Sequence, residues 1–162
     1  MLLVSDANIF MDFEAAELTV QLFELPHEIV VPDTLYREEL DARHPHLRAL
    51  GLQVRTLTGE QVGEAYTLRV RFPGVSVNDL FALVLARSLR CPLVTGDSRL
   101  RAAAEAEGLH LLGTLALVEQ MVQQALVSVA EVERGYERMR NAGRRLPWDA
   151  VTRQLDAFRA ER

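Results

Sequence analysis

The sequence predicts an α/β protein, a three-layer α/β/α sandwich with a mostly parallel central sheet, followed by C-terminal helices. Two observations support this fold class. Short apolar runs alternate with helical patterns through residues 2–112, at the spacing typical of repeated β-α units. The apolar runs are hydrophobic on both faces, as expected of parallel strands that are covered by helices on either side.

The predicted elements alternate strictly up to residue 112. The strands are expected at residues 2–5, 28–31, 52–57, 92–95 and 109–112. The helices between them are expected at residues 9–25, 34–42, 59–70, 77–89 and 98–107. The helix at residues 77–89 is the clearest of these, because its apolar residues cover nearly every side and therefore predict a buried helix.

The pattern changes after Gly113, where helices follow one another without an intervening strand. These helices are expected at residues 114–126, 129–141 and 148–159, with breaks at Ser128, at Gly143 and at Pro147. We therefore divide the chain into an α/β unit of residues 1–113 and a helical extension of residues 114–162. The extension either packs on the same domain or offers a surface for self-association.

Composition narrows the classes of function. The chain has 162 residues, enough for one domain with a substantial core, and its N-terminal LLVSD begins a strand and predicts neither a signal peptide nor a membrane span. A single cysteine, Cys91, indicates a reducing cytoplasm and a small core residue. Every basic residue apart from histidine is arginine, and the absence of lysine excludes a phosphate-binding loop of the G-x-x-x-x-G-K type and any Schiff-base mechanism.

The net charge of −5 argues against a general nucleic-acid binder, yet the charge is unevenly distributed. Residues 134–162 contain eight arginines and four acidic residues, so the tail is basic. The arginines at 138, 140, 144 and 145 could extend a phosphate-binding track or form the edge of an interface.

Acidic residues stand at the strand-to-helix turns. Asp6 and Asp97 each follow a predicted strand, whereas Asp79 and the pair Glu38 and Glu39 lie near the start of predicted helices. If the two strands are neighbours in a parallel sheet, the carboxylates of Asp6 and Asp97 converge at its C-terminal edge. Oxygen ligands without a nearby cysteine or histidine cluster suit Mg²⁺ or Mn²⁺.

Each acid also has a simpler explanation. Asp6 and Asp97 suit helix N-caps, Ser76 and Asp79 match a capping box, and the two glutamates after an Asp33 N-cap complement a helix dipole. Capping alone does not account for the coincidence of all these acids at one edge. Without a cation, such a cluster would raise its own pKa values and cost stability.

Four segments in order resemble the PIN-domain nucleases. They are VSDAN at residues 4–8, VPDTLYRE at residues 31–38, NDLFAL at residues 78–83 and LVTGD at residues 93–97. The resemblance runs from residue 2 to about residue 112, and the tail resembles that of PIN proteins known only as predicted nucleic-acid-binding proteins. VapC-type toxins are similar through the core and usually shorter.

The resemblance implies a set of site residues. The metal-binding acids would be Asp6, Asp79 and Asp97, joined by one catalytic glutamate. Counting from Pro32 favours Glu38 for this role, and counting back from Leu40 favours Glu39; we favour Glu38. The polar residues expected to line the site are Asn8, Thr95 and Ser98. Arg99 and Arg101, on the helix that begins after Asp97, either contact RNA phosphates or belong to a solvated helix face.

The implied function is metal-dependent hydrolysis of RNA phosphodiester bonds by a cytoplasmic endoribonuclease, with Mg²⁺ or Mn²⁺ as cofactor and single-stranded or structured RNA as substrate. A homodimer is expected, since PIN-like proteins commonly self-associate. Two alternatives remain: a PIN-like nucleic-acid-binding or regulatory protein without turnover, and a toxin held by an antitoxin protein. The pair His44 and His46 has a spacing found in metal sites, but Pro45 between them favours a surface turn.

Overall fold

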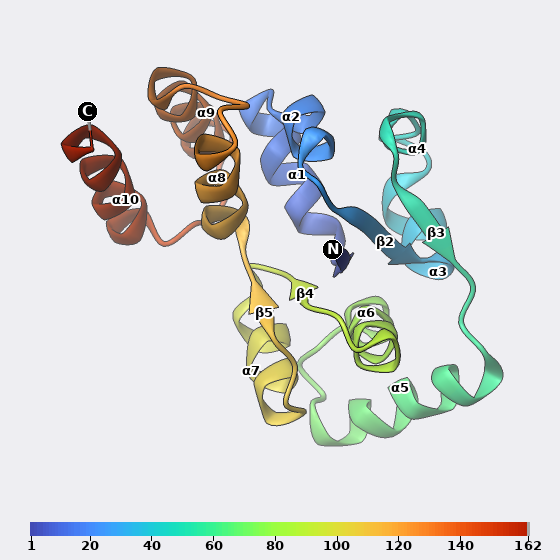
Figure 1. Cartoon of the computed structure of the whole chain (residues 1–162). Coiled ribbons are helices and arrows are strands. Elements are labelled where there is room, and N and C mark those ends of the chain that lie inside the picture. The colour runs from blue at the N-terminus through green and yellow to red at the C-terminus, as the bar shows by residue number, and fades with distance from the viewer. Residues whose placement is uncertain (162) are drawn as a thin grey trace.

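The computed structural model describes residues 1–161 and contains a five-stranded sheet in the order β3-β2-β1-β4-β5 (Figure 1). All four strand pairs are parallel. The strands are β1 (Leu2–Ser5), β2 (Glu28–Pro32), β3 (Gln53–Arg55), β4 (Leu93–Val94) and β5 (Leu111–Leu112). The predicted α/β class with a parallel sheet is confirmed, although the last three strands are shorter than predicted.

The strand order places a topological switch point between β1 and β4. The chain moves outward from β1 through β2 to β3, and then returns to the other side of β1 to form β4 and β5. Val4 of β1 pairs with Leu93 of β4, and the Asp6 N–H donates to the Val94 carbonyl at 3.2 Å. In open α/β sheets, ligands bind beyond the C-terminal strand ends at such a switch point.

The helices follow the predicted order with three differences. They are α1 (Ala7–Ala16), α2 (Thr19–Glu24), α3 (Asp33–Leu35), the π-helix η1 (Tyr36–Leu40), α4 (His46–Leu50), α5 (Gly59–Arg71), α6 (Val77–Leu89), α7 (Ser98–Ala106), α8 (Thr114–Gln123), α9 (Val129–Asn141) and α10 (Trp148–Ala160). The helix predicted at 9–25 is two helices, because Glu17 adopts a left-handed conformation with φ of 59° and ends α1. The helix predicted at 34–42 is α3 followed by η1, and α4, which begins at the last residue of the turn predicted at 44–46, was not predicted. Asp33 is the first residue of α3 and not its N-cap, which is Pro32.

Helix α6 is the central helix of one face of the sheet. Its residues from Leu80 to Ala86 are all buried, as the all-round apolar pattern predicted. It contacts β1, β2 and β4, and α5 packs along its outer side. Figure 1 shows α5, α6 and α7 on one side of the sheet, with α1, α2 and α8 on the other.

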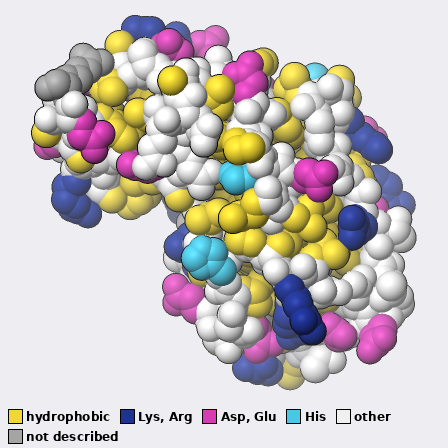
Figure 2. Space-filling view, in the orientation of Figure 1, with side chains coloured by type: hydrophobic (Ala, Val, Ile, Leu, Met, Phe, Trp, Pro, Cys, Tyr) yellow, Lys and Arg dark blue, Asp and Glu magenta, His cyan; other side chains and the backbone are white. Residues whose placement is uncertain are grey.

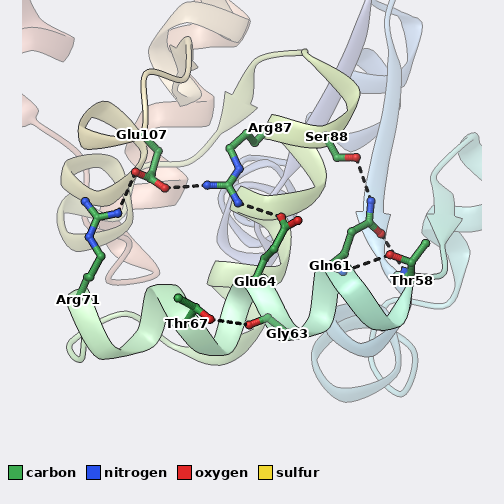
Figure 3. Close-up of polar contacts among 9 residues, drawn as sticks. All are labelled: Thr58, Gln61, Gly63, Glu64, Thr67, Arg71, Arg87, Ser88 and Glu107. Carbon is green, nitrogen blue, oxygen red and sulfur yellow. Dashed lines mark hydrogen bonds and ion pairs between the residues drawn. The ribbon is translucent and has the colours of Figure 1, made fainter.

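An ion-pair network holds α5, α6 and α7 together (Figure 3). The Arg87 guanidinium donates to Glu107 at 2.7 Å and to Glu64 at 2.9 Å, and Arg71 reaches the second Glu107 oxygen at 3.2 Å. Glu107 is the least exposed member, with 13% of its side chain accessible. Because two arginines satisfy this carboxylate, the end of α7 is fixed to α5 and α6.

The C-terminal helices pack on α1. Gly135 of α9 lies so close to α1 and the loop after it that an added Cβ would meet Leu18 Cδ1 at 3.0 Å. Helix α8 buries Val118 and Met121 in the core of this chain, so intramolecular packing accounts for most of its apolar stripe. Hence the extension is built onto the α1 face of the sheet.

The outer surface mixes charge and apolar character. Figure 2 shows hydrophobic side chains near the centre of the face seen in Figure 1, with charges of both signs around them. Within residues 1–161, no helix combines the length and the apolarity needed to cross a membrane.

Candidate active site

Asp6 is the most deeply buried acid of the site. It follows β1 and caps α1, since its Oδ1 accepts a hydrogen bond from the Ile9 N–H at 3.2 Å. Its Oδ2 accepts a hydrogen bond from the Thr95 hydroxyl at 2.5 Å. Burial raises the pKa of Asp6 to about 7, with a smaller contribution from the charge on Asp79, while the Thr95 hydrogen bond opposes the rise.

Asp97 occupies the equivalent position after the neighbouring strand β4. Its Oδ1 caps α7 by accepting from the Leu100 N–H at 2.8 Å. Its own N–H donates to the Thr95 hydroxyl oxygen at 3.1 Å. Thr95 therefore links the two acids, because one hydroxyl group bonds to the Asp6 carboxylate and to the Asp97 backbone.

Asp79 enters from the start of α6. Its N–H donates to the capping Ser76 hydroxyl at 3.2 Å, and its carboxylate is half-buried. Burial raises the pKa of Asp79 to about 6, and the charges on Glu39 and Asp97 add to this rise. Asp79 therefore interacts electrostatically with three other acids of the site, Asp6, Glu39 and Asp97.

The two glutamates of η1 are placed differently. The Glu38 carboxylate accepts a hydrogen bond from the Asn78 amide at 2.8 Å. Burial raises the pKa of Glu39, and its charge acts directly on Asp79. A hydrogen bond from Asn78 opposes the rise in the Glu39 pKa, so both glutamates approach Asn78, and of the two only Glu39 acts on Asp79.

These carboxylates form an open cluster. Within residues 1–161, no three of them bring their oxygens within 4.8 Å of one another. The charge on Asp79 still raises the pKa of Asp6, and the charges on Glu39 and Asp97 raise that of Asp79, each adding to the larger effect of burial. Such spacing suits Mg²⁺, which keeps several of its waters and is usually held by one or two carboxylates.

A groove of about 440 Å³ adjoins the acids. Asn8, Asp97 and Ser98 line it on one side, and Arg144 and Arg145 line it on the other. A second hollow of about 630 Å³ shares Ser98 and Arg145 with it. The polar residues predicted to line the site thus divide: Asn8 and Ser98 face the groove, and Thr95 is buried behind the acids.

The two arginines predicted to contact RNA differ in their surroundings. Arg101 is partly buried, donates to the Thr95 carbonyl at 2.7 Å and lines the larger hollow. Arg99 is exposed and has a long contact of 3.4 Å with the Gly74 carbonyl. Arg101 therefore supports the end of β4, and Arg99 is the more available of the two for a phosphate.

A buried ion pair beside the groove was missed by sequence reasoning. Asp12 of α1 is 6% exposed, and its carboxylate accepts from the Arg144 Nε at 2.7 Å and from the Thr114 hydroxyl at 2.9 Å. The one available signal was a charged residue between Met11 and Phe13 in an apolar helix. Its partners, 132 and 102 residues away, left no local pattern.

Comparison with known protein families shows to which family this chain belongs. A sequence comparison matches residues 2–159, nearly the whole chain, to the family DUF3368, a PIN domain. This chain belongs to the PIN-domain family. No curated protein matches it in a sequence search.

Solved structures show the same PIN-like fold at low sequence identity. A PilT N-terminus domain protein, SSO1118 from Sulfolobus solfataricus P2, is 12% identical, with a TM-score of 0.52 over 75% of this chain and 93% of its own. PAE2754 from Pyrobaculum aerophilum is 18% identical, with a TM-score of 0.53 over 76% of this chain and 99% of its own. VapBC2 from Rickettsia felis, bound to a DNA fragment from its promoter, is 14% identical, with a TM-score of 0.46 over 70% of this chain and 98% of its own.

PIN domains are typically nucleases and usually depend on a metal ion. The donor set at this PIN-domain site fits a hard divalent cation, because it consists of carboxylate oxygens from β1, η1, α6 and β4. Asp6 and Asp79, whose pKa values are raised to about 7 and about 6, would be returned to their ionised forms by a bound cation.

Proposed function

We propose that this PIN-domain protein is a metal-dependent endoribonuclease that hydrolyses phosphodiester bonds of RNA. One observation carries the proposal: carboxylates from four separate segments meet at the switch point of the sheet, where burial and then the charges of neighbouring acids raise the pKa of Asp6 and Asp79. The fold gains nothing from this mutual repulsion, and a divalent cation removes it. The proposed site acids are Asp6, Glu39, Asp79 and Asp97.

Glu39 is proposed as the site glutamate in place of Glu38, which counting along the sequence favoured. The charge on Glu39 acts on Asp79, and burial raises the Glu39 pKa. Both glutamates are exposed, so the choice rests on the charge that Glu39 exerts on Asp79, while Glu38 accepts the Asn78 amide hydrogen bond at 2.8 Å. Its role in this proposal is to hold Asn78, the residue next to Asp79.

In the proposed hydrolysis, the acidic side chains would hold the metal ion in a fixed position, and the metal ion would stabilise negative charge. Mg²⁺ or Mn²⁺ held by these acids would lower the pKa of a bound water and stabilise the charge that develops on the phosphate. Asp6 is held by Ile9 and Thr95, so its carboxylate is fixed before any ligand arrives. Asp97 uses Oδ1 for its cap and leaves Oδ2 for the site.

RNA is the proposed substrate because the basic groove leads to the acids. Arg145 lines both hollows beside Asp97 and Ser98, and Arg99 lies exposed on the same α7 turn. These arginines would neutralise phosphates on either side of the cleaved bond. Arg101 would act from its anchored position at the end of β4.

The test is cleavage of a mixed single-stranded RNA pool with Mg²⁺ or Mn²⁺, comparing the wild type with Asp79→Asn and Asp97→Asn. Asparagine caps a helix as well as aspartate, which preserves the α7 cap in Asp97→Asn, and the cap of α6 is Ser76 and is untouched in Asp79→Asn, so the fold survives both changes. We expect cleavage to fall by more than about 100-fold in each variant, since the loss of a metal ligand exceeds that of a supporting residue. Asp149→Asn changes an exposed acid in the first turn of α10 and serves as the matched control.

Other outcomes point to the alternatives. Metal-dependent cleavage that persists in both variants would reduce these acids to helix caps and contradict the proposal. A folded wild type that cuts no RNA with either metal would favour a nucleic-acid-binding protein without turnover, or a toxin that needs release from an antitoxin protein. The expected homodimer is tested separately by sedimentation of the pure chain.

A further inference from the structure

We propose that Glu14, His44 and His46 form a second metal site, which binds Zn²⁺ and is separate from the acidic cluster. One ligand atom of each side chain lies within 4.8 Å of the other two, the only such group of three among residues 1–161. The His46 Nε2 and the Glu14 Oε1 are 2.5 Å apart. The rings of His44 and His46 meet edge to face, with their centroids 6.1 Å apart.

The backbone holds these ligands in place. The His44 N–H donates to the Leu40 carbonyl at 2.8 Å, and the His44 carbonyl accepts from the Leu47 N–H at 3.2 Å. Leu40 and Leu47 are both fully buried, so the segment is anchored at either end. Pro45 restricts the backbone between the histidines, and a site formed in advance loses less conformational entropy on binding.

The geometry needs only a small adjustment. Zn–N and Zn–O bonds of about 2.0–2.2 Å in a tetrahedral site separate neighbouring ligand atoms by about 3.4 Å. The His46 and Glu14 atoms would therefore move apart by about 0.9 Å from their present 2.5 Å. Their side chains are 48% and 28% exposed, which leaves room for this movement.

The ligand types select the metal. Two imidazoles and one carboxylate are a set that Zn²⁺ binds readily, with the fourth position open to water. Mg²⁺ prefers oxygen ligands and octahedral geometry, so it would compete poorly here. The two sites in this chain thus differ in chemistry: oxygen ligands beside Asp6, and a histidine-based set near the C-terminal end of α1.

Bound Zn²⁺ would fasten the segment after η1 to α1. Glu14 lies in α1, His44 lies between η1 and α4, and His46 is the first residue of α4. A ligand that binds only the folded state stabilises it in proportion to the logarithm of its concentration. At a hundredfold excess over the dissociation constant, Tm would rise by roughly 5–10 °C for a chain of this size.

The test is Zn²⁺ titration of untagged protein by calorimetry in the presence of excess Mg²⁺, which occupies the oxygen-ligand site. We expect one Zn²⁺ per chain for the wild type and at least about tenfold weaker binding for His44→Ala and His46→Ala. His110→Ala removes another exposed histidine and should leave binding unchanged. Glu14→Gln keeps an oxygen for His46 but loses the charge, and should also weaken binding.

Folding is checked by the Tm of each variant without metal, which should stay close to that of the wild type because none of the three side chains is fully buried. The proposal is overturned if the wild type binds no Zn²⁺ under these conditions, or if His44→Ala, His46→Ala and His110→Ala bind it equally. A Tm that does not rise with Zn²⁺ in the wild type would overturn the stabilising role.

Discussion

At the residue scale, a single carboxylate can cap a helix and also belong to the proposed metal site, as Asp6 and Asp97 illustrate. Asp6 gives one oxygen to the Ile9 N–H and the other to Thr95, and Asp97 gives only Oδ1 to its cap. The sequence left capping and metal binding as competing explanations because it shows residue types and not individual oxygens. Thr95 was predicted only as a lining residue, yet it joins the two acids across β1 and β4.

The raised pKa of Asp6 predicts how stability depends on pH. Between the ordinary value of 3.8 and the folded value of about 7, the folded protein keeps a proton on Asp6 that the unfolded chain releases. The free energy of unfolding contributed by Asp6 therefore falls as pH rises through this range, by up to about 4 kcal/mol in total. Asp6→Asn removes this loss, so the metal-free variant should be more stable than the wild type at pH 8 by a similar amount.

Urea denaturation in the presence of a chelator, at pH 5 and pH 8, measures this difference. Asp149→Asn serves as control because its carboxylate is exposed. Added Mg²⁺ should restore the wild type at pH 8 and leave Asp6→Asn nearly unaffected. A wild type that gains stability relative to Asp6→Asn between these two pH values would show that Asp6 ionises freely in the fold.

At the element scale, the π-helix η1 bears on the proposed choice of Glu39 over Glu38. In η1 the Asp41 N–H donates to the Tyr36 carbonyl at 2.8 Å, five residues back. The wider turn rotates the side chains relative to an α-helix, and such turns occur frequently at functional sites. Counting from Pro32 favoured Glu38, and a count along the sequence does not reveal the rotation of side chains that a π-turn introduces.

The two glutamates provide a matched pair of variants. Glu39→Gln should lower kcat/KM of metal-dependent RNA cleavage by about 100-fold, because it removes a charge that acts on Asp79. Glu38→Gln keeps an oxygen for the Asn78 amide and should cost about tenfold or less. Single-turnover cleavage with Mn²⁺ compares them directly. Equal losses, or a larger loss for Glu38→Gln, would assign the site to Glu38.

Most elements were predictable from periodicity, and the misses have local causes. The ranges 77–89 and 129–141 were predicted as observed, because capping serines and apolar periods agree there. The break after α1 was missed because Glu17 is neither glycine nor proline, although it adopts the left-handed conformation. The short helix α4 was missed because its one fully buried residue is Leu47, and the preceding His-Pro-His sequence is typical of a loop.

At the scale of the whole molecule, the site is completed by the C-terminal extension. Arg144 follows α9 and reaches the buried Asp12 of α1, while its Nη2 approaches the Asn8 carbonyl at 3.4 Å. Thr114, at the start of α8, bonds to the same carboxylate. The sequence indicated the basic tail but could not show which arginine turns inward, because that depends on a contact spanning 132 residues.

Arg144 and Arg145 are adjacent in the sequence but should have different roles: Arg144 should stabilise the fold, and Arg145 should bind RNA. Arg144→Met leaves Asp12 buried with Thr114 as its remaining partner, and should lower the free energy of unfolding by about 2–3 kcal/mol. Arg145→Met changes an exposed side chain and should alter stability by less than about 0.5 kcal/mol. Because Arg145 lines the groove beside Asp97, its loss should weaken RNA binding.

Salt dependence separates these two effects. For Arg145→Met, the slope of log K against log[salt] for single-stranded RNA should become less negative by about 0.7, the value for one lost phosphate contact. Arg144→Met should keep the wild-type slope at temperatures where it remains folded, because its guanidinium is engaged by Asp12. Denaturation and RNA-binding titrations at several salt concentrations give both quantities. If the slope changes in Arg144→Met and not in Arg145→Met, then Arg144 is the residue that meets the phosphate and the ion pair with Asp12 opens when RNA binds.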